Sequence, residues 1–215
     1  MRPRAIFFDF DGTLADSYEA IAASVNHVRQ AWRLAPLTVD EVKRHVGRGA
    51  DQLLAETCPE CDVAEGLALY RAHHPSVMLT GTRLLPGARA ALEALHAAGI
   101  RLGICSNKPR AFTERIVTHL GIAEFFAALL GPEDVRHIKP APDMLLTGIK
   151  RLNVSAAETL YVGDMVVDIR TARAAGVRVW VVPTGSDSRG GLESAAPDRL
   201  IENLAVIPGL IASEP

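Results

Sequence analysis

The sequence contains only three cysteines among its 215 residues, at Cys58, Cys61 and Cys105. An odd and small set cannot form a complete disulfide framework, so we expect reduced thiols. Cys58 and Cys61 form a Cys-x-x-Cys pair followed by His73 and His74, which leaves a zinc or redox site open as an alternative. Paired structural zinc motifs repeat their ligand spacing, and this one does not, which favours a plain turn between helices.

Long hydrophobic runs and an excess of charge are also absent. No apolar run approaches the roughly 20 residues that span a bilayer, so we expect no contact with a membrane. The chain runs from Met1 directly into the first predicted strand, and we therefore expect no signal peptide and a cytoplasmic location. The formal net charge of -2 comes without a long basic block, which argues against nucleic acid as a partner. The oligomeric state, monomer or dimer, stays open.

Short apolar runs alternate with amphipathic helical stretches through most of the chain, at residues 5–8, 100–105, 127–130, 159–162 and 177–182. This alternation is typical of a parallel sheet with crossover helices. The interval 17–81 is different, because its helical patterning continues without a convincing strand. The sequence therefore predicts an α/β fold, in which residues 1–16 and 82–215 form a Rossmann-like parallel sheet core and residues 17–81 form an inserted all-helical domain.

Local signals predict several boundaries. Thr38 and Glu41 have the spacing of a capping box, which predicts the start of a helix. Residues 75–82 begin with a proline, and we expect them to carry the chain back to the sheet. The segment 185–191 is rich in glycine and serine, which predicts a loop. Residues 199–204 are expected to form a short final strand.

Two carboxylates, Asp9 and Asp11, directly follow the first apolar run, where Gly12 allows a sharp turn. Side chains alternate along a strand, so both carboxylates should emerge on the same side. Two anions this close repel each other, and a shared proton or a cation relieves the repulsion. An oxygen-only cluster suits Mg²⁺, which makes this segment a predicted metal site. By itself, however, Asp-x-Asp-Gly is also a common turn sequence.

Further polar groups follow other predicted strands. Ser106 and Asn107 come after the second strand, where a hydroxyl, an amide and the first N–H groups of a helix suit an anion such as phosphate. Lys139 closes the loop after the third strand and is able to neutralise charge on phosphate or aspartate. Asp164 and Asp168 follow the fourth strand, one helical turn apart. Ligand sites in open α/β sheets form beyond the carboxyl ends of strands, so we expect these groups to gather at one site.

In order, spacing and placement, these segments resemble the four motifs of the haloacid dehalogenase superfamily of phosphotransferases. The resemblance covers essentially the whole chain, and the helical insert between the first two motifs corresponds to the small cap domain of that superfamily. Within it, the sequence looks most like the phosphoglycolate phosphatase branch. The supporting segments are residues 9–14 (DFDGTL), 46–50 (VGRGA), 106–109 (SNKP), 139–142 (KPAP) and 161–164 (YVGD).

The resemblance implies a mechanism for the two leading carboxylates. Asp9 would be the nucleophile that attacks phosphorus and forms an aspartyl-phosphate. Asp11 would protonate the leaving oxygen and then activate water. Mg²⁺ would be the cofactor, held by Asp9, the backbone carbonyl of Asp11 and Asp164, and it would screen the repulsion between nucleophile and phosphate.

The remaining motif residues receive supporting roles from the same resemblance. Lys139 would share in neutralising charge, and Asp168 would orient Lys139 or metal-bound waters. Ser106 and Asn107 would bind the transferring phosphoryl group. Arg48, in the cap, would face the site and contact an anionic substrate, although its glycine neighbours also suit a simple turn between helices.

Together these roles imply a Mg²⁺-dependent phosphatase whose partner is a small-molecule phosphate ester, with 2-phosphoglycolate as the best single candidate. A phosphosugar mutase or a pyrophosphatase on the same scaffold stays open, because hydrolysis and transfer share the aspartyl-phosphate. A non-catalytic phosphate-binding protein is a third interpretation, which the intact motif residues disfavour.

Overall fold

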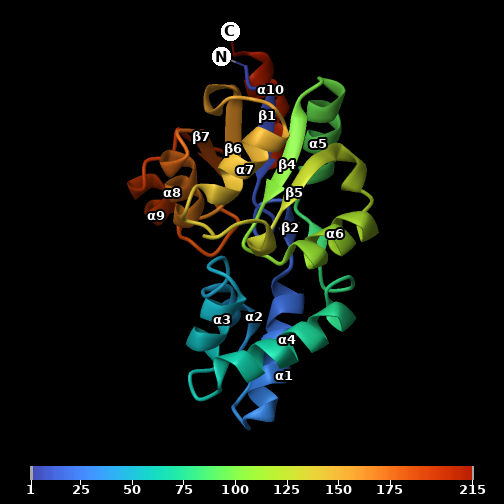
Figure 1. Cartoon of the computed structure of the whole chain (residues 1–215), viewed down its shortest axis with the longest axis vertical. Helices are drawn as coiled ribbons and strands as arrows, with labels where there is room; N and C mark the ends of the chain where they lie inside the picture. The colour runs from blue at the N-terminus through green and yellow to red at the C-terminus, as the bar shows by residue number, and fades with distance from the viewer. Residues whose placement is uncertain (1, 215) are drawn as a thin grey trace.

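The core of the protein is a six-stranded sheet, seen in a computed structural model that describes residues 2–214 (Figure 1). Its strands are β1 (Ala5–Phe8), β4 (Arg101–Cys105), β5 (Phe126–Leu130), β6 (Thr159–Gly163), β7 (Arg178–Val181) and β8 (Arg199–Leu200). They stand in the order β5-β4-β1-β6-β7-β8. Every neighbouring pair is parallel, which confirms the predicted α/β class.

Helices cover both faces of this sheet: α5 (Ala88–Ala97), α6 (Arg110–His119) and α10 (Ile207–Ala212) on one face, and α7 (Asp143–Arg151), α8 (Val166–Ala174) and α9 (Arg189–Ser194) on the other. Ile6 and Phe8 of β1 pack with the first group, whereas Ala5 and Phe7 pack with the second. Successive side chains of a strand point to opposite faces, and both faces are buried here, so β1 is apolar at every position.

Short connecting helices complete this domain. Four segments form single 3-10 turns, at Ala123–Phe125, Pro132–Asp134, Ala156–Glu158 and Leu204–Val206. The first and third lie directly before β5 and β6, so they lead the chain into the sheet.

A separate group of helices lies beyond one end of the sheet and packs around its own core (Figure 1). It consists of α1 (Tyr18–Ala31), α2 (Val39–Lys43), α3 (Ala50–Thr57) and α4 (Val63–Val77), and we call residues 18–81 the helical lobe. Val25, Val28 and Leu54 are at the centre of its core. The chain enters and leaves the lobe through β2 (Ala15–Asp16) and β3 (Arg83–Leu84), which pair antiparallel. Both connections therefore lie side by side.

One boundary of the lobe differs from the prediction. Pro75 lies inside α4 and not in a connection that returns to the sheet. Tyr70, His74 and Met78, spaced by four residues, are all buried. The helix continues past the proline because residues at this spacing share one helix face, and that face packs inward.

Other local predictions are mostly confirmed. Thr38 and Glu41 form the expected capping box at the start of α2. The segment 185–191 is a loop only in its first part, because α9 begins at Arg189 and Ser188 accepts a hydrogen bond from the N–H of Gly191. Within residues 2–214, none of the helices combines the length and the apolar character that crossing a membrane requires.

Candidate active site

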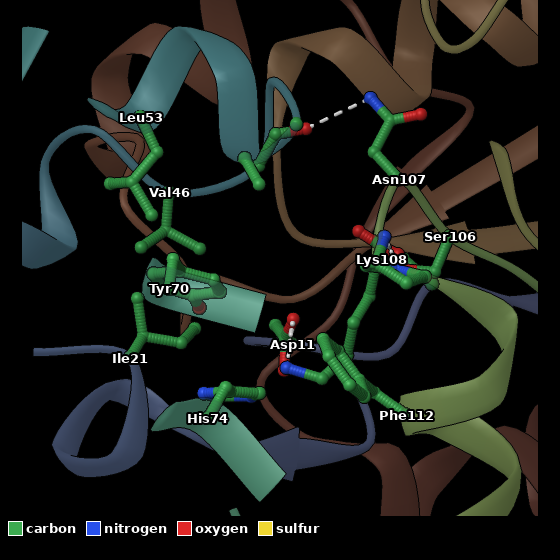
Figure 2. A pocket seen from close by; sticks show the side chains of 15 residues that line it. Asp11, Ile21, Val46, Leu53, Tyr70, His74, Ser106, Asn107, Lys108 and Phe112 are labelled. Atoms are coloured by element: carbon green, nitrogen blue, oxygen red, sulfur yellow. Dashed lines mark hydrogen bonds and ion pairs between the residues drawn. The ribbon is translucent and has the colours of Figure 1, made fainter. Parts of the chain in front are cut away.

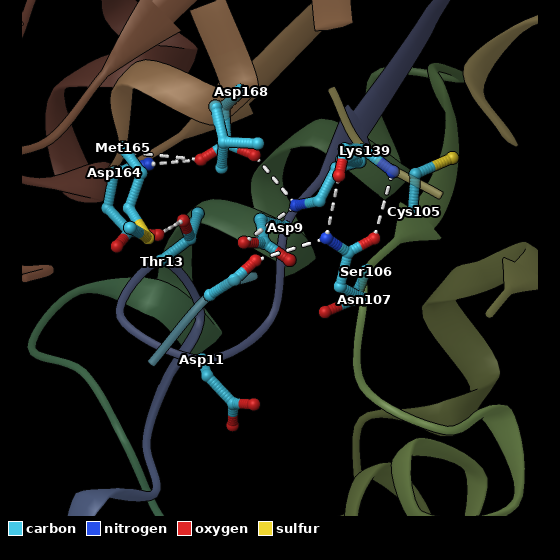
Figure 3. A network of polar contacts seen from close by, with 12 residues as sticks. Asp9, Asp11, Thr13, Cys105, Ser106, Asn107, Lys139, Asp164, Met165 and Asp168 are labelled. Carbon is cyan, nitrogen blue, oxygen red and sulfur yellow. Dashed lines mark hydrogen bonds and ion pairs between the residues drawn. The ribbon is translucent and has the colours of Figure 1, made fainter. Parts of the chain in front are cut away.

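The predicted motif residues come together where the parallel strands end, at a pocket shared with the helical lobe (Figure 3). Asp9 directly follows β1, Ser106 follows β4, and Asp164 follows β6. Because β1 pairs with both β4 and β6, these three strand ends are immediate neighbours. The location is the crevice at which open α/β sheets bind their ligands.

Asp9 lies at the centre of the group and is almost fully buried, with 3% of its surface exposed. Its Oδ2 lies 2.9 Å from Nζ of Lys139, whereas its Oδ1 is buried and has no hydrogen-bond partner among the described residues. Its backbone N–H donates to the carbonyl of Val162 at 2.9 Å, which fixes its place at the strand end. Lys139 thus holds Oδ2 of Asp9, whereas Oδ1 is unsatisfied. Buried polar atoms in proteins nearly always have a partner, so a bound ligand or ion is expected at Oδ1.

Lys139 supplies the positive charge next to Asp9. Its side chain is fully buried, and its Nζ lies 2.7 Å from Oδ1 of Asp168 and donates to the hydroxyl of Tyr161 at 3.1 Å. Burial alone would lower the pKa of Lys139, but the charges of Asp168 and Asp9 outweigh burial and raise the pKa above its usual value. The ammonium group therefore stays charged and fixes a carboxylate on each side.

Asp164 and Asp168 have different environments although they stand on the same turn. Oδ1 of Asp168 pairs with Lys139, and its Oδ2 accepts from the N–H groups of Asp164 and Met165 at 3.1 and 3.0 Å. Oδ1 of Asp164 accepts from the Thr13 hydroxyl at 2.5 Å, but its Oδ2 is buried without a partner in residues 2–214. Burial and the charge of Asp168 raise the pKa of Asp164 well above its ordinary value. A nearby cation would stabilise the ionised form of Asp164.

Asp9 and Asp164 have the chemistry of a site for a hard cation. Carboxylate oxygens of Asp9, Asp164 and Asp168 lie within 4.8 Å of one another, and the first two residues each present an unpartnered buried oxygen. Both oxygens of Asp168 are already used, so it supports the cluster rather than completing it. A Cβ atom at Gly12 or Gly185 would overlap the Asp164 carboxylate, so the backbone is packed closely around it. An oxygen-only donor set fits Mg²⁺.

The carboxylate of Asp11 points away from this cluster (Figure 3). Nζ of Lys108 lies 3.2 Å from both of its oxygens. Both residues line the pocket, with 12% of the Asp11 side chain and 5% of the Lys108 side chain exposed. Asp9 therefore faces the carboxylates of Asp164 and Asp168, whereas the carboxylate of Asp11 faces the pocket.

The pocket lies between the sheet and the helical lobe and opens onto Asp9 and Asp11 (Figure 2). Its floor carries polar groups of Ser106, Asn107 and Lys108. The rest of the lining is mostly apolar and comes from the lobe and from α6, through Ile21, Val46, Leu53, Tyr70, His74 and Phe112. A phosphate ester with its phosphorus at Asp9 would place its leaving group in this pocket, between the apolar side chains and Lys108.

Ser106 and Asn107 both line the pocket, but their roles differ. The Ser106 hydroxyl oxygen accepts from the N–H of Lys108 at 3.3 Å, and its own hydrogen is available to an anion. The Asn107 amide accepts from the N–H of Lys139 at 3.0 Å and donates to its carbonyl at 3.1 Å. It also donates to the carbonyl of Gly47 at 3.1 Å. Asn107 therefore positions Lys139 and ties the helical lobe to the sheet.

Arg48 is not brought to the pocket. Its guanidinium lies 3.0 Å from the Glu56 carboxylate, and its side chain is 49% exposed. It lines a neighbouring groove together with Arg71 and Ile138. His45 lies 2.6 Å from the same Glu56 carboxylate. Arg48 is thus paired with Glu56 and does not line the pocket, where the resemblance implies a contact with substrate.

Lys108, Tyr70 and His74 all line the pocket, but the sequence patterns do not point to any of them as a pocket residue. Lys108 directly follows the Ser106–Asn107 motif, and this adjacency is the one available signal. The rings of Tyr70 and His74 stack with centroids 5.1 Å apart, but a spacing of four residues is equally typical of any core-facing helix. Burial and the charge of Lys108 lower the pKa of His74 to about 3, so its imidazole is neutral at pH 7.

All three cysteines are free and buried. Burial and the neighbouring Cys61 raise the pKa of the Cys58 thiol to about 12, so it is not a thiolate at neutral pH. Across residues 2–214, the single cluster of three potential metal ligands is that of Asp9, Asp164 and Asp168. The Cys-x-x-Cys pair therefore has no third ligand beside it.

Comparison with known proteins identifies the family of this chain. The family model described as haloacid dehalogenase-like hydrolase matches residues 6–182. A phosphoglycolate phosphatase of Rhodospirillum rubrum is 37% identical over 194 residues, which cover 85% of this chain and 80% of the relative. A plasmid-encoded phosphoglycolate phosphatase of Cupriavidus necator is 30% identical over 213 residues, which cover 96% and 92%. A solved Bacteroides fragilis structure, described as a haloacid dehalogenase-like hydrolase, has a TM-score of 0.90 at 31% identity and covers 96% of this chain and 100% of its own.

Proposed function

The chain belongs to the haloacid dehalogenase-like hydrolases and is a phosphoric monoester hydrolase, and we propose that it cleaves a small phosphate monoester through an aspartyl-phosphate on Asp9 with bound Mg²⁺. One observation carries this proposal. One Asp9 oxygen is fixed by Lys139 at 2.9 Å, while the other is buried and unpartnered beside the pocket. A carboxylate held in one orientation next to a cation site is suited to attack on phosphorus.

The reaction has two steps in this proposal. Asp9 attacks phosphorus, the bond from phosphorus to the leaving oxygen breaks, and Asp11 gives its proton to that oxygen. Asp11 then takes a proton from the water that attacks the aspartyl-phosphate, which releases phosphate and restores Asp9. The position of the Asp11 carboxylate in the pocket, on the leaving-group side, supports this division.

Positive charge and hydrogen-bond donors hold the phosphate in place. Lys139 neutralises part of the charge that builds up around Asp9, and Asp168 keeps its ammonium group in position at 2.7 Å. The Ser106 hydroxyl is available to a phosphate oxygen. Asp9, Asp164 and the backbone carbonyl of Asp11 would hold Mg²⁺, which would supply charge neutralisation at the phosphate oxygens.

We propose 2-phosphoglycolate as the substrate. The names of the Rhodospirillum rubrum and Cupriavidus necator relatives support this choice. Apolar side chains of the lobe, such as Val46 and Leu53, line the pocket together with Asp11 and enclose the space left for a leaving group.

We also propose that the helical lobe is a cap over the site, with residues 17–81 as the cap and residues 1–16 and 82–215 as the core domain. Few polar contacts join the two parts. Asn107 donates to the carbonyl of Gly47 at 3.1 Å, Lys43 donates to the carbonyl of Thr184 at 3.1 Å, and the Ser186 hydroxyl donates to the carbonyl of Val46 at 3.3 Å. A lobe held by so few bonds can open to admit substrate and close to exclude water.

Phosphate release from a panel of phosphate monoesters, with and without Mg²⁺, tests the proposal. We expect 2-phosphoglycolate to give the highest kcat/KM, and removal of Mg²⁺ by a chelator to abolish turnover. Asp9→Asn keeps the size of the side chain but loses its nucleophilicity, so kcat should fall at least about 1000-fold.

Asp16→Asn is the matched control, because it neutralises an exposed carboxylate near the same turn and should keep full activity. Circular dichroism should show both variants folded. Full turnover by Asp9→Asn, or turnover without any divalent cation, would refute the mechanism.

A further inference from the structure

Lys108 is a buried lysine that the mechanism above does not use. It lies just before α6, lines the pocket and has 7% of its surface exposed. Its Nζ lies 3.2 Å from both oxygens of Asp11, and residues 2–214 contain no other carboxylate in ion-pair contact with it. An ammonium group shared evenly by both oxygens competes with a leaving oxygen for this carboxylate.

Lys108 is also the single lysine or arginine among the described residues that line the pocket. Lys139 lies on the other side of the site, where Asp9 and Asp168 hold it at 2.9 and 2.7 Å. Arg48 lies outside the pocket, paired with a carboxylate of its own lobe. A negative charge on the leaving group therefore meets Lys108 rather than either of the other two cations.

His74 is the second polar group next to Lys108, and it adds no charge. The residue is fully buried, its Nδ1 lies 2.9 Å from the Ser24 hydroxyl, and its Nε2 has no partner among the described residues. Burial and the charge of Lys108 lower the pKa of His74 to about 3, which keeps the ring neutral. Figure 2 shows His74 and Phe112 on either side of the Lys108–Asp11 pair. This end of the pocket thus offers one positive charge and one neutral polar nitrogen.

We propose that Lys108 recognises a single negative charge on the leaving group, and that it exchanges Asp11 for this charge when the substrate binds. The inference rests on the proposed phosphatase function and narrows its substrates to esters whose leaving group carries one carboxylate-type anion. Because Asp11 faces the leaving oxygen, an anion within a few bonds of that oxygen lies within reach of Nζ. Nε2 of His74 is the neutral group beside it.

The exchange couples recognition to chemistry. When the substrate anion takes over Lys108, the carboxylate of Asp11 is released, takes up a proton from solvent and can deliver it to the leaving oxygen. When the leaving group is uncharged, Lys108 stays paired with Asp11. Such an ester therefore lacks the contact with Lys108 and also lacks Asp11 as a proton donor. A second phosphate group carries up to two negative charges and meets only one cation, so a bisphosphorylated sugar should be a poor substrate.

A matched pair of esters tests this inference. 2-Phosphoglycolate and 2-hydroxyethyl phosphate have the same chain length, but the second has a neutral alcohol in place of the carboxylate. We expect the wild-type enzyme to favour 2-phosphoglycolate, and Lys108→Met to lower the ratio of the two kcat/KM values at least about 30-fold, as expected when one partner of a buried charge pair is removed. Arg48→Met, which removes a cation outside the pocket, should leave the ratio unchanged. An unchanged ratio in Lys108→Met, or a fall of this size in Arg48→Met, would overturn the inference.

A binding measurement separates this inference from the proposed function. In the Asp9→Asn background, where turnover is blocked, calorimetry with Mg²⁺ measures the affinity for 2-phosphoglycolate itself. Adding Lys108→Met should weaken that affinity at least about tenfold and leave the affinity for inorganic phosphate within about threefold. If neither ester is hydrolysed by the wild-type enzyme, the proposed function fails, while this loss of affinity still supports the role of Lys108. Equal affinities with and without Lys108 would reject the role.

Discussion

At the scale of single residues, the site uses chemically identical groups for different tasks according to their partners. Asp168 has both oxygens satisfied by Lys139 and by two backbone N–H groups. Asp9 and Asp164 each keep one buried oxygen without a partner among the described residues. A satisfied carboxylate positions its neighbours, whereas an unsatisfied one is ready to bind a cation. Lys108 and His74 also differ in their partners. Lys108 is paired with Asp11, whereas His74 is neutral at pH 7 and its Nε2 has no partner among the described residues.

His74 should make the protein less stable in mildly acidic solution. The folded protein lowers the pKa of His74 to about 3, whereas an exposed histidine has a pKa of about 6.5. Between these values the unfolded chain binds a proton that the folded protein does not bind. The free energy of unfolding therefore falls as the pH drops from about 6.5 towards 3, by at most about 1.4 kcal/mol per pH unit from this residue.

Urea unfolding of the wild type and of His74→Phe between about pH 7.5 and about pH 5 measures this contribution. The phenylalanine ring keeps the aromatic shape and cannot be protonated, so the variant should lose less stability than the wild type as the pH falls. A difference in the free energy of unfolding that stays constant over this range would contradict the expectation.

At the scale of elements, the turn after β1 determines where Asp164 can lie. Gly12 has a φ of 84°, and a Cβ atom there would overlap the Tyr18 hydroxyl and the Asp164 carboxylate. The N–H of Gly12 donates to the carbonyl of Ala15 at 2.8 Å, which closes the turn. The glycine is thus required both for the backbone conformation and for the close approach to a candidate metal ligand.

Gly12→Ala and Gly99→Ala separate these two requirements. Gly99 also has a positive φ, of 75°, but a Cβ atom there would meet nothing within 4 Å. Both variants carry backbone strain of about 1 kcal/mol. Only Gly12→Ala displaces Asp164, so only this variant should also lose activity, by at least about tenfold, and require more Mg²⁺. Thermal unfolding and phosphate-release assays measure the two effects, and equal losses of activity in both variants would count against the packing argument.

How far the sequence predicts these elements depends on whether the deciding interaction is local. The strands around β1 and the clustering of Asp9, Ser106 and Asp164 follow from hydrophobic runs and from the rule that parallel strands end at one edge. The course of α4 through Pro75 does not follow, because burial of Tyr70 and His74 against distant residues outweighs the local signal of a proline.

The same limit applies inside the site. The sequence places Arg48 next to flexible glycines, but the attraction of Glu56, eight residues away, decides its direction. Lys108 is unremarkable in the sequence and acquires a role only because Asp11, which is 97 residues away, lies opposite it. Such pairings depend on tertiary packing, so local pattern does not contain them.

At the scale of the whole molecule, two bodies share one pocket. The lobe and the sheet each have a hydrophobic core of their own. Hydrogen bonds such as those from Asn107 to Gly47 and from Lys43 to Thr184 join them, and each contributes about 1 kcal/mol net. Open and closed arrangements of the proposed cap should therefore differ by only a few kcal/mol, a balance that a ligand contacting both bodies can shift.

Small-angle X-ray scattering tests this balance. We expect the radius of gyration of the free protein to exceed that of the protein saturated with Mg²⁺ and a phosphate mimic such as orthovanadate. Asn107→Ala removes the bond to Gly47, so the free variant should be at least as extended as the free wild type. Identical scattering with and without the mimic, together with an unchanged cleft in crystal structures of both states, would rule out closure.

The antiparallel pair β2–β3 has a consequence for how such proteins diversify. Ala15 lies opposite Leu84 and Asp16 opposite Arg83, so the two ends of the insert are adjacent. The residues between these two strands form a single insertion, and replacing that insertion leaves the connectivity of the sheet intact. A different lobe joined at this junction would change the residues on the lobe side of the pocket and leave Asp9, Asp164 and Lys139 in place.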